Sequence, residues 1–181
     1  NDGPTAHLEI PRGDLAPLLS DAAQARYPYR FGDRLEAAAD TAAGASVTFS
    51  RGMHEPLHAA LVPAGVATST RELVSDGATD PPSTAMTLAY FTISRTKEDD
   101  RMWRWYNATE GRGVSLRPDR HGTTRAMLMI QQPPNGEQDW DADRQRAFLH
   151  ARSADVGWEG PRVLAALDDT DDFYFDVLRQ V

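Results

Sequence analysis

The stretch Thr87–Gln131 decides the expected fold, because it contains four short strand patterns separated by turn-forming residues. The expected strands cover residues 87–94, 101–106, 113–117 and 125–131. Apolar and polar side chains alternate along these segments, which is the pattern of a strand with one buried face. Connections as short as those between them usually join neighbouring strands. The sequence therefore predicts an antiparallel sheet with a meander topology.

Composition limits what the rest of the chain can do. Its 181 residues are enough for one domain or two small lobes, and 40% of them are hydrophobic, which is sufficient for a core. The net charge of −8 argues against nucleic-acid binding, because phosphate recognition needs a basic surface. The absence of cysteine excludes disulfides, thiolate metal sites and a cysteine nucleophile. No apolar run is long enough to span a membrane, so we expect a cytoplasmic protein, and the sequence specifies no oligomeric state.

The residues before the sheet are expected to form a small lobe. Apolar residues recur at helical spacing over 15–23, with Asp14 placed to cap the helix and Pro17 tolerable only in the first turn. Further strands are expected in the regions 27–39 and 46–50, and a third apolar run covers residues 58–62. The segment Asp76–Ser83 contains two prolines, a glycine and two aspartates, and we expect the boundary of the lobe there.

The expected fold class is α+β, with a central antiparallel or mixed sheet, helices on one of its faces, and the small N-terminal lobe. Residues 1–80 are assigned to the lobe and residues 81–181 to the sheet domain. After the sheet, elements are expected at 141–155 (a helix capped by Asp141), 162–167 (a second helix) and 173–177 (a strand).

Three patterns invite a chemical interpretation and fail in their context. The segment His54–His58 matches the zinc motif H-E-x-x-H, but Pro56 prevents the helix that would bring both histidines to one face. The acidic segment Asp168–Asp172 lacks the spacing of a calcium loop, and a solvated turn is the better interpretation. Gly111–Gly113 is half of a dinucleotide fingerprint, but it lies in a hairpin.

The expected sheet has two chemically different faces. Alternation directs one set of side chains to an apolar face that can carry the two C-terminal helices. The other face combines aromatic, methionine, hydroxyl and arginine side chains, which suits a wall that orients an aromatic or polycyclic ligand. Spacing alone favours a simpler interpretation, an ordinary solvated face with arginine stacked on tyrosine. The candidate substrate-binding residues are Tyr90, Thr92, Arg104, Tyr106 and Met129.

A set of segments in a fixed order carries a family resemblance. The segments are Leu8–Leu15, Tyr29–Asp33, Ser69–Arg71, Tyr90–Ile93, Met102–Asn107, Leu116–Arg125, Gly157–Leu164 and Phe173–Asp176. Together they resemble the central part of group A flavoprotein monooxygenases, the aromatic hydroxylase type that binds FAD. The resemblance covers nearly the whole chain. It implies an N-terminal lobe derived from the FAD-binding domain, followed by a substrate-binding domain.

The resemblance also implies the cofactors FAD and NAD(P)H, with Arg12 as the one retained FAD contact. The sequence departs from the family pattern at the flavin-binding motifs. It lacks the opening G-x-G-x-x-G turn and the closing Gly-Asp motif, and Ala64 stands where the family has the aspartate of a middle Asp-Gly motif. We therefore expect this chain by itself to bind FAD weakly or not at all.

The functional expectation is a partial or truncated flavoprotein monooxygenase that supplies the substrate-binding wall for an aromatic or polyketide-like molecule. No catalytic side chain is nominated, because in this family the flavin carries the chemistry. Two alternatives stay open. One is an FAD-independent descendant that preorganises its substrate, such as a natural-product cyclase, and the other is a non-catalytic small-molecule binding module. Flavin absorbance after purification separates the first hypothesis from these two, and turnover without flavin separates the cyclase from the binding module.

Overall fold

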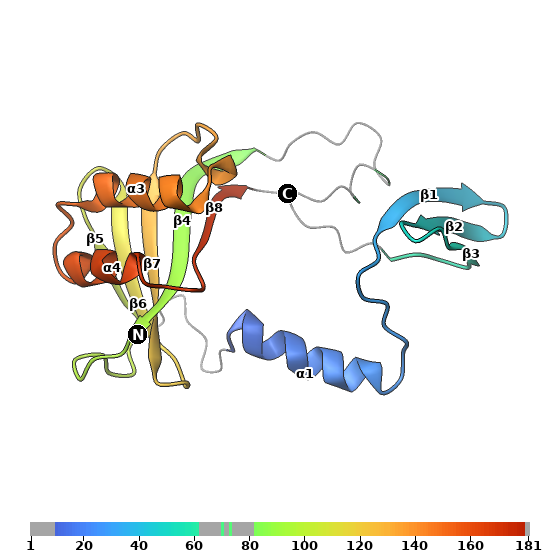
Figure 1. Cartoon of the computed structure of the whole chain (residues 1–181), viewed down its shortest axis with the longest axis horizontal. Coiled ribbons are helices and arrows are strands. Elements are labelled where there is room, and N and C mark those ends of the chain that lie inside the picture. The colour runs from blue at the N-terminus through green and yellow to red at the C-terminus, as the bar shows by residue number, and fades with distance from the viewer. Residues whose placement is uncertain (1–9, 62–69, 71–72, 74–81, 180–181) are drawn as a thin grey trace. The chain divides into compact units, whose positions relative to one another are not determined.

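The chain divides into two compact units between Ala78 and Thr79. Figure 1 shows their helices and strands. The residues that the computed structural model describes are 10–61, 70, 73 and 82–179. The predicted motif positions Ala64 and Ser69 lie outside these residues. The derivation of the first unit from an FAD-binding domain stays a prediction.

The first unit contains helix α1 and a three-stranded antiparallel sheet in the order β1-β2-β3. The elements are α1 (Arg12–Gln24), β1 (Leu35–Thr41), β2 (Gly44–Phe49) and β3 (His54–Leu57). Gly44 begins β2 directly after a tight turn, with φ of +136°, and a Cβ at this position would lie 2.2 Å from the carbonyl oxygen of Leu57. Only glycine permits this close approach of β3.

Several expectations for this unit need correction. Pro11 occupies the N-cap position of α1 without a side-chain hydrogen bond, so Asp14 lies in the first turn and does not cap the helix. Its carboxylate still interacts favourably with the positive end of the helix dipole. Pro17 lies inside the helix, beyond the first turn. The third strand covers 54–57, immediately before the apolar run, and it holds the first histidine of the zinc-like motif in pairing with β2.

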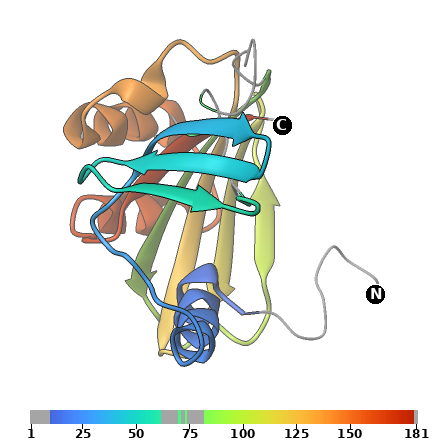
Figure 2. The ribbon, with the colours of Figure 1, turned by 90° about the vertical axis from the view of Figure 1, so that its right-hand side faces the viewer.

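The second unit is a five-stranded antiparallel sheet with α3 and α4 on the same face (Figures 1 and 2). The strands are β4 (Ser83–Ser94), β5 (Arg104–Asn107), β6 (Arg112–Pro118), β7 (Thr123–Gln131) and β8 (Tyr174–Arg179). The helices are the 3-10 turn η1 (Glu137–Asp139), α3 (Ala142–Ser153) and α4 (Gly160–Leu167). The predicted α+β class is confirmed. None of the helices formed by the described residues is both long and apolar enough to cross a membrane.

The expected meander is wrong at one connection. Strands β5, β6 and β7 form a meander, but β4 pairs with β7 and β8, so the order is β5-β6-β7-β4-β8. Residues 95–103 carry the chain from β4 across the ends of β7 and β6 to the far edge, in the manner of a Greek key. A short connection can do this because an extended residue covers about 3.3 Å and neighbouring strands lie only about 4.8 Å apart. We call residues 95–103 the crossover.

The core lies between the sheet and the two helices. Directly opposed residues of an antiparallel pair share a face. The register pairs Ala89 with Leu128 and Leu128 with Val114, and all three are at most 1% exposed. The helices contribute buried side chains to the same cluster, among them Leu149, Val163 and Leu167. One face of every central strand therefore packs in the core, and the opposite face is available for a different role.

Helix α3 is fixed at both ends. The carboxylate of Asp141 accepts a hydrogen bond from the Arg144 backbone N–H at 2.8 Å, which confirms the predicted N-cap. Beyond the C-terminus of α3, the buried guanidinium of Arg112 donates to the Asp155 carboxylate and, at 3.0 Å, to the Arg152 carbonyl. Because Arg112 begins β6, these contacts hold the helix against the sheet.

Candidate functional site

A row of five side chains crosses the face of the sheet opposite α3 and α4, which we call the second face. The strand register assigns one residue of this cross-sheet row to each strand: Trp105, Ser115, Met127, Tyr90 and Tyr174. Ser115 and Met127 are buried, whereas the three aromatic residues are between 42% and 54% exposed. The cross-sheet row thus has accessible rings on both sides of a packed middle.

Two tyrosines form one end of the cross-sheet row. The ring centroids of Tyr90 and Tyr174 are 6.5 Å apart, with a tilt of 43° between the rings. The Tyr174 hydroxyl donates to the Asp176 carboxylate at 2.7 Å. Burial raises the pKa of the Tyr90 phenol, so its hydroxyl stays protonated and available as a donor at neutral pH. This end therefore offers hydrogen-bonding groups beside aromatic surface.

Two tryptophans form the other end. Trp103 and Trp105 have ring centroids 5.1 Å apart. The Trp103 indole N–H donates to the Ser115 hydroxyl, and the Arg117 guanidinium lies 5.3 Å from a Trp103 ring centroid. These contacts hold Trp103 in place, while Trp105 is 48% exposed. Neither tryptophan is among the ligand contacts predicted from the sequence.

Met129 extends the apolar surface beside the cross-sheet row. It lies directly opposite Gly113 on β6, and a Cβ at Gly113 would come within 2.7 Å of the Met129 methyl carbon. The methionine therefore occupies the space that a side chain on β6 would take. Its flexible thioether can adapt to ligands of different outline.

The Thr92 side chain also lies on the second face, but its hydroxyl is engaged in a network within the protein. It donates to the Asp172 carboxylate and accepts from Arg125 at 2.6 Å. Asp172 also accepts from the Thr92 backbone N–H and from Arg125, each at 2.7 Å. Burial raises the pKa of Asp172, but these hydrogen bonds and the Arg125 charge outweigh it and hold the pKa below its usual value. The network ties β4 and β7 to the loop before β8.

Arg104 and Tyr106 lie on the helix-covered face, so the expectation that all five candidates share one wall is wrong. Both residues oppose core residues of β6, and the Tyr106 ring centroid lies 6.0 Å from that of Trp158. Alternation within β5 is as expected. The sequence did not show which β5 side chains share a face with those of β4, because the crossover and not a tight turn connects the two strands.

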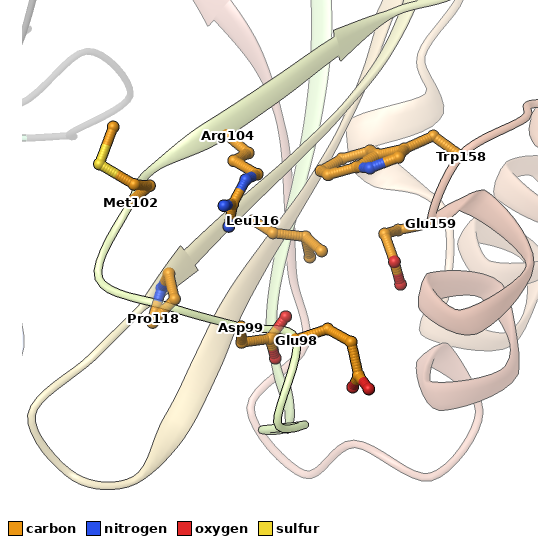
Figure 3. A pocket seen from close by; sticks show the side chains of 8 residues that line it. All are labelled: Glu98, Asp99, Met102, Arg104, Leu116, Pro118, Trp158 and Glu159. Carbon is orange, nitrogen blue, oxygen red and sulfur yellow. The ribbon is translucent and has the colours of Figure 1, made fainter.

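A cavity of about 170 Å³ lies on the helix-covered side, next to the crossover (Figure 3). Its lining residues are Glu98, Asp99, Met102, Arg104, Leu116, Pro118, Trp158 and Glu159. The Asp99 carboxylate accepts two hydrogen bonds from Arg162, at 2.5 and 2.9 Å, and one from the Thr124 hydroxyl at 2.9 Å. The hydrogen bonds from Arg162 outweigh the effect of burial and lower the pKa of Asp99 to about 2. This ion pair anchors the crossover to α4.

Two further sequence candidates lie in the first unit. Arg12 is exposed at the start of α1, and its FAD contact stays a prediction. His54 lies on a strand instead of a helix, and its imidazole is within 3.1 Å of the Ser46 hydroxyl and 3.2 Å of the Thr48 hydroxyl. The part of the chain that the structure describes contains no group of three or more His, Cys, Asp or Glu that could hold a metal ion.

Comparison with known proteins identifies relatives, although no protein-family model matches the sequence. A flavin-dependent monooxygenase from an unknown prokaryotic organism is 27% identical over 176 residues, which are 96% of this chain and 45% of the relative. The FAD-dependent monooxygenase asL6 of Sarocladium schorii is 25% identical over 200 residues, which are 99% of this chain and 47% of the relative. The chain is related to flavin-dependent monooxygenases over their central portion. This confirms the resemblance found in the sequence, and the chain spans about half the length of the curated relatives it matches.

Solved structures share the fold. Tetracycline destructase Tet(55) has a TM-score of 0.74 at 23% identity, with coverage of 92% of this chain and 44% of that chain. Klebsiella pneumoniae HpxO in complex with FAD and uric acid has a TM-score of 0.73 at 20% identity, with coverage of 93% and 43%. Both identities are below 25%, so these structures establish the common fold and not a common substrate.

Proposed function

We propose that this chain provides the substrate-binding wall of a flavin-dependent monooxygenase that acts on an aromatic or polyketide-like small molecule. The observation that carries the proposal is the cross-sheet row, with exposed aromatic rings at Trp105, Tyr90 and Tyr174 on either side of buried Met127. Aromatic rings on a rigid sheet favour offset stacking with a planar ligand. The relatives named above supply the link to flavin chemistry.

The dimensions of the second face fit a ligand with several rings. The cross-sheet row covers four spacings between strands, so its ends lie about 19 Å apart at about 4.8 Å per spacing. A planar ligand can stack at the tryptophan end and reach the Tyr174 hydroxyl and Asp176 at the other end. Hydrogen bonds to these polar groups would fix its orientation, while Met129 adapts to its outline.

We infer that FAD binding needs more than the described residues of this chain. A pyrophosphate site needs several converging backbone N–H groups at a helix N-terminus. At the start of α1, Pro11 has no N–H group, and Asp14 adds a negative charge to the first turn. Arg12 is a cation at this end, but one side chain does not replace a glycine-rich turn. We therefore assign substrate binding and orientation to this chain.

Tetracycline and uric acid, which the names of two similar structures mention, are suitable probes of the second face. Calorimetric titration of the 181-residue chain should detect binding of at least one of them. Trp105→Leu should weaken that binding about fivefold, because loss of one stacking contact costs about 1 kcal/mol. The matched control is Trp158→Leu on the helix-covered side, which should leave the affinity unchanged. No binding of either probe, or equal loss in both variants, contradicts the proposal.

The same preparations decide the role of flavin. Flavin absorbance that survives purification supports direct participation in the monooxygenase reaction, and contradicts an FAD-free cyclase or binding module. Colourless protein that converts a bound substrate without flavin favours the cyclase. Colourless protein that binds without turnover favours the binding module. Each outcome is read from an absorption spectrum and a product assay.

A further inference from the structure

We propose that the cavity beside the crossover is a second binding site, specific for a small organic cation such as an alkylammonium or guanidinium group. The cavity lies on the helix-covered side of the sheet, whereas the proposed substrate wall is the second face. Its volume of about 170 Å³ is below the range of about 300–1,000 Å³ that is usual for drug-sized ligands. It therefore suits a small head group instead of a polycyclic molecule.

Charge selects the class of ligand. Arg162 forms ion pairs with both Asp99 and Glu159, so this group of three keeps one net negative charge. Glu98 contributes a second negative charge, and it has no hydrogen bond or ion pair with any other described residue. Arg104 is neutralised by two hydrogen bonds to a neighbouring aspartate, at 2.5 and 2.7 Å. The side chains that line the cavity therefore carry a net negative charge, which favours a cation over an anion.

Trp158 adds an aromatic surface to these carboxylates. Its φ of +53° is uncommon for a bulky residue, so the surrounding packing imposes its position. The ring packs 6.0 Å from Tyr106 and is still 41% exposed. In Figure 3 the ring points from the connection between α3 and α4 toward Leu116 and Arg104, above the carboxylates. An accessible indole face beside negative charge is the combination that binds organic cations through cation–π attraction.

Other ligand classes fit less well. A divalent metal ion would need a cluster of several ligands, and none of three or more exists among the described residues. A neutral aromatic molecule would use the Trp158 ring but would leave the Glu98 charge unused. A cation with methyl or methylene groups can contact Met102 and Leu116 while its charge lies near the carboxylates. The lining of the cavity thus matches the two parts of such a ligand.

Tetramethylammonium and methylguanidinium test this inference, with tert-butanol as a neutral molecule of similar shape. Binding to the 181-residue chain is followed by ¹H–¹⁵N NMR at the Trp158 indole N–H, which is assigned by its absence in Trp158→Leu. Both cations should shift this signal with millimolar affinity, and tert-butanol should not. Glu98→Gln should weaken cation binding about threefold, and more at low salt, because one partly screened charge is removed. Since Glu98 is exposed and unpaired within the described chain, this variant should fold normally.

Two controls separate this site from other effects. Glu110→Gln removes a charge from the turn at the other end of the β5–β6 hairpin and should leave cation affinity unchanged. Trp105→Leu should also leave the cation affinity unchanged. The proposed cation site can therefore be refuted without refuting the proposed substrate-binding wall, and the wall can be refuted without refuting the cation site. No shift with either cation, an equal shift with tert-butanol, or unchanged affinity in Glu98→Gln overturns the inference.

Discussion

Replacement of Asp99 by asparagine tests the anchor of the crossover. The side chain is 7% exposed, and its pKa falls from 3.8 to about 2 in the folded protein, chiefly because Arg162 donates two hydrogen bonds. That difference corresponds to about 2 kcal/mol of folding stability at neutral pH. Asp99→Asn removes this contribution and leaves Glu159 as the ionic partner of Arg162 among the described residues. We expect the free energy of unfolding in urea to fall by about 2–3 kcal/mol at pH 7.

The pH dependence of the stability difference between the wild type and Asp99→Asn can refute this account of the anchor. The pKa of Asp99 is lower in the folded than in the unfolded chain, so the unfolded chain binds more protons as the pH falls from about 4 to about 2. The stabilisation is complete above this window and is lost through it, with about half of it gone at pH 3. The gap between the wild type and Asp99→Asn should narrow accordingly. Asp100→Asn, which removes an exposed ion pair, is the control and should cost much less than Asp99→Asn. A loss at pH 7 that is no larger in Asp99→Asn than in this control, or a gap between the wild type and Asp99→Asn that does not change with pH, refutes the reasoning.

Two further predictions concern single contacts. Thr92→Val removes the hydroxyl shared by Asp172 and Arg125, so the free energy of unfolding measured by thermal denaturation should fall by about 1–2 kcal/mol. Because this hydroxyl already donates a hydrogen bond within the protein, the affinity for tetracycline or uric acid should not change. A drop in ligand affinity without a drop in stability would instead make Thr92 a ligand contact. Gly44→Ala should destabilise the first unit by more than about 2 kcal/mol, because the added methyl meets the β3 backbone, and Gly52→Ala, where no atom lies within 4 Å of the added methyl, should cost less. Equal sensitivity of the two variants to limited proteolysis would contradict this account.

Elements whose own residues carry the signal were predictable from the sequence. Most of strand β7 was predicted from the alternation over 125–131, and α3 begins directly after the predicted capping aspartate. The position of β4 was not predictable, because its partners β7 and β8 follow much later in the chain. Pairing between strands that are distant in sequence depends on burial of the whole sheet and on the contacts that anchor the crossover. Loop length predicts neither of these.

The candidate site also contains residues whose positions could be predicted from local alternation and residues whose positions depend on pairing between distant strands. Tyr90, Thr92 and Met129 were correctly grouped on one face, because β4 and β7 both alternate clearly. Trp105 was missed, although the short turn after β5 would have allowed its pairing with Ser115 to be counted. The register of β5 relative to β4 cannot be obtained by counting residues in this way, because the crossover separates the two strands. A shift of one residue in phase exchanges the faces of every side chain on a strand, so the error moved the tryptophans away from the expected wall and moved arginine and tyrosine onto it.

The crossover is the feature that gives the two faces of the sheet different chemistry. It carries the chain to the edge beside β6, where alternation along β5 directs Trp105 to the second face and Arg104 to the cavity. The same segment brings Asp99 against Arg162 of α4 and leaves the Glu98 carboxylate at the cavity wall. An aromatic surface and an acidic cavity therefore arise from one connection, on opposite sides of the sheet. Because they share this scaffold but no lining residue, a variant that loosens the anchor should weaken both, whereas a variant of either surface should affect only its own ligand.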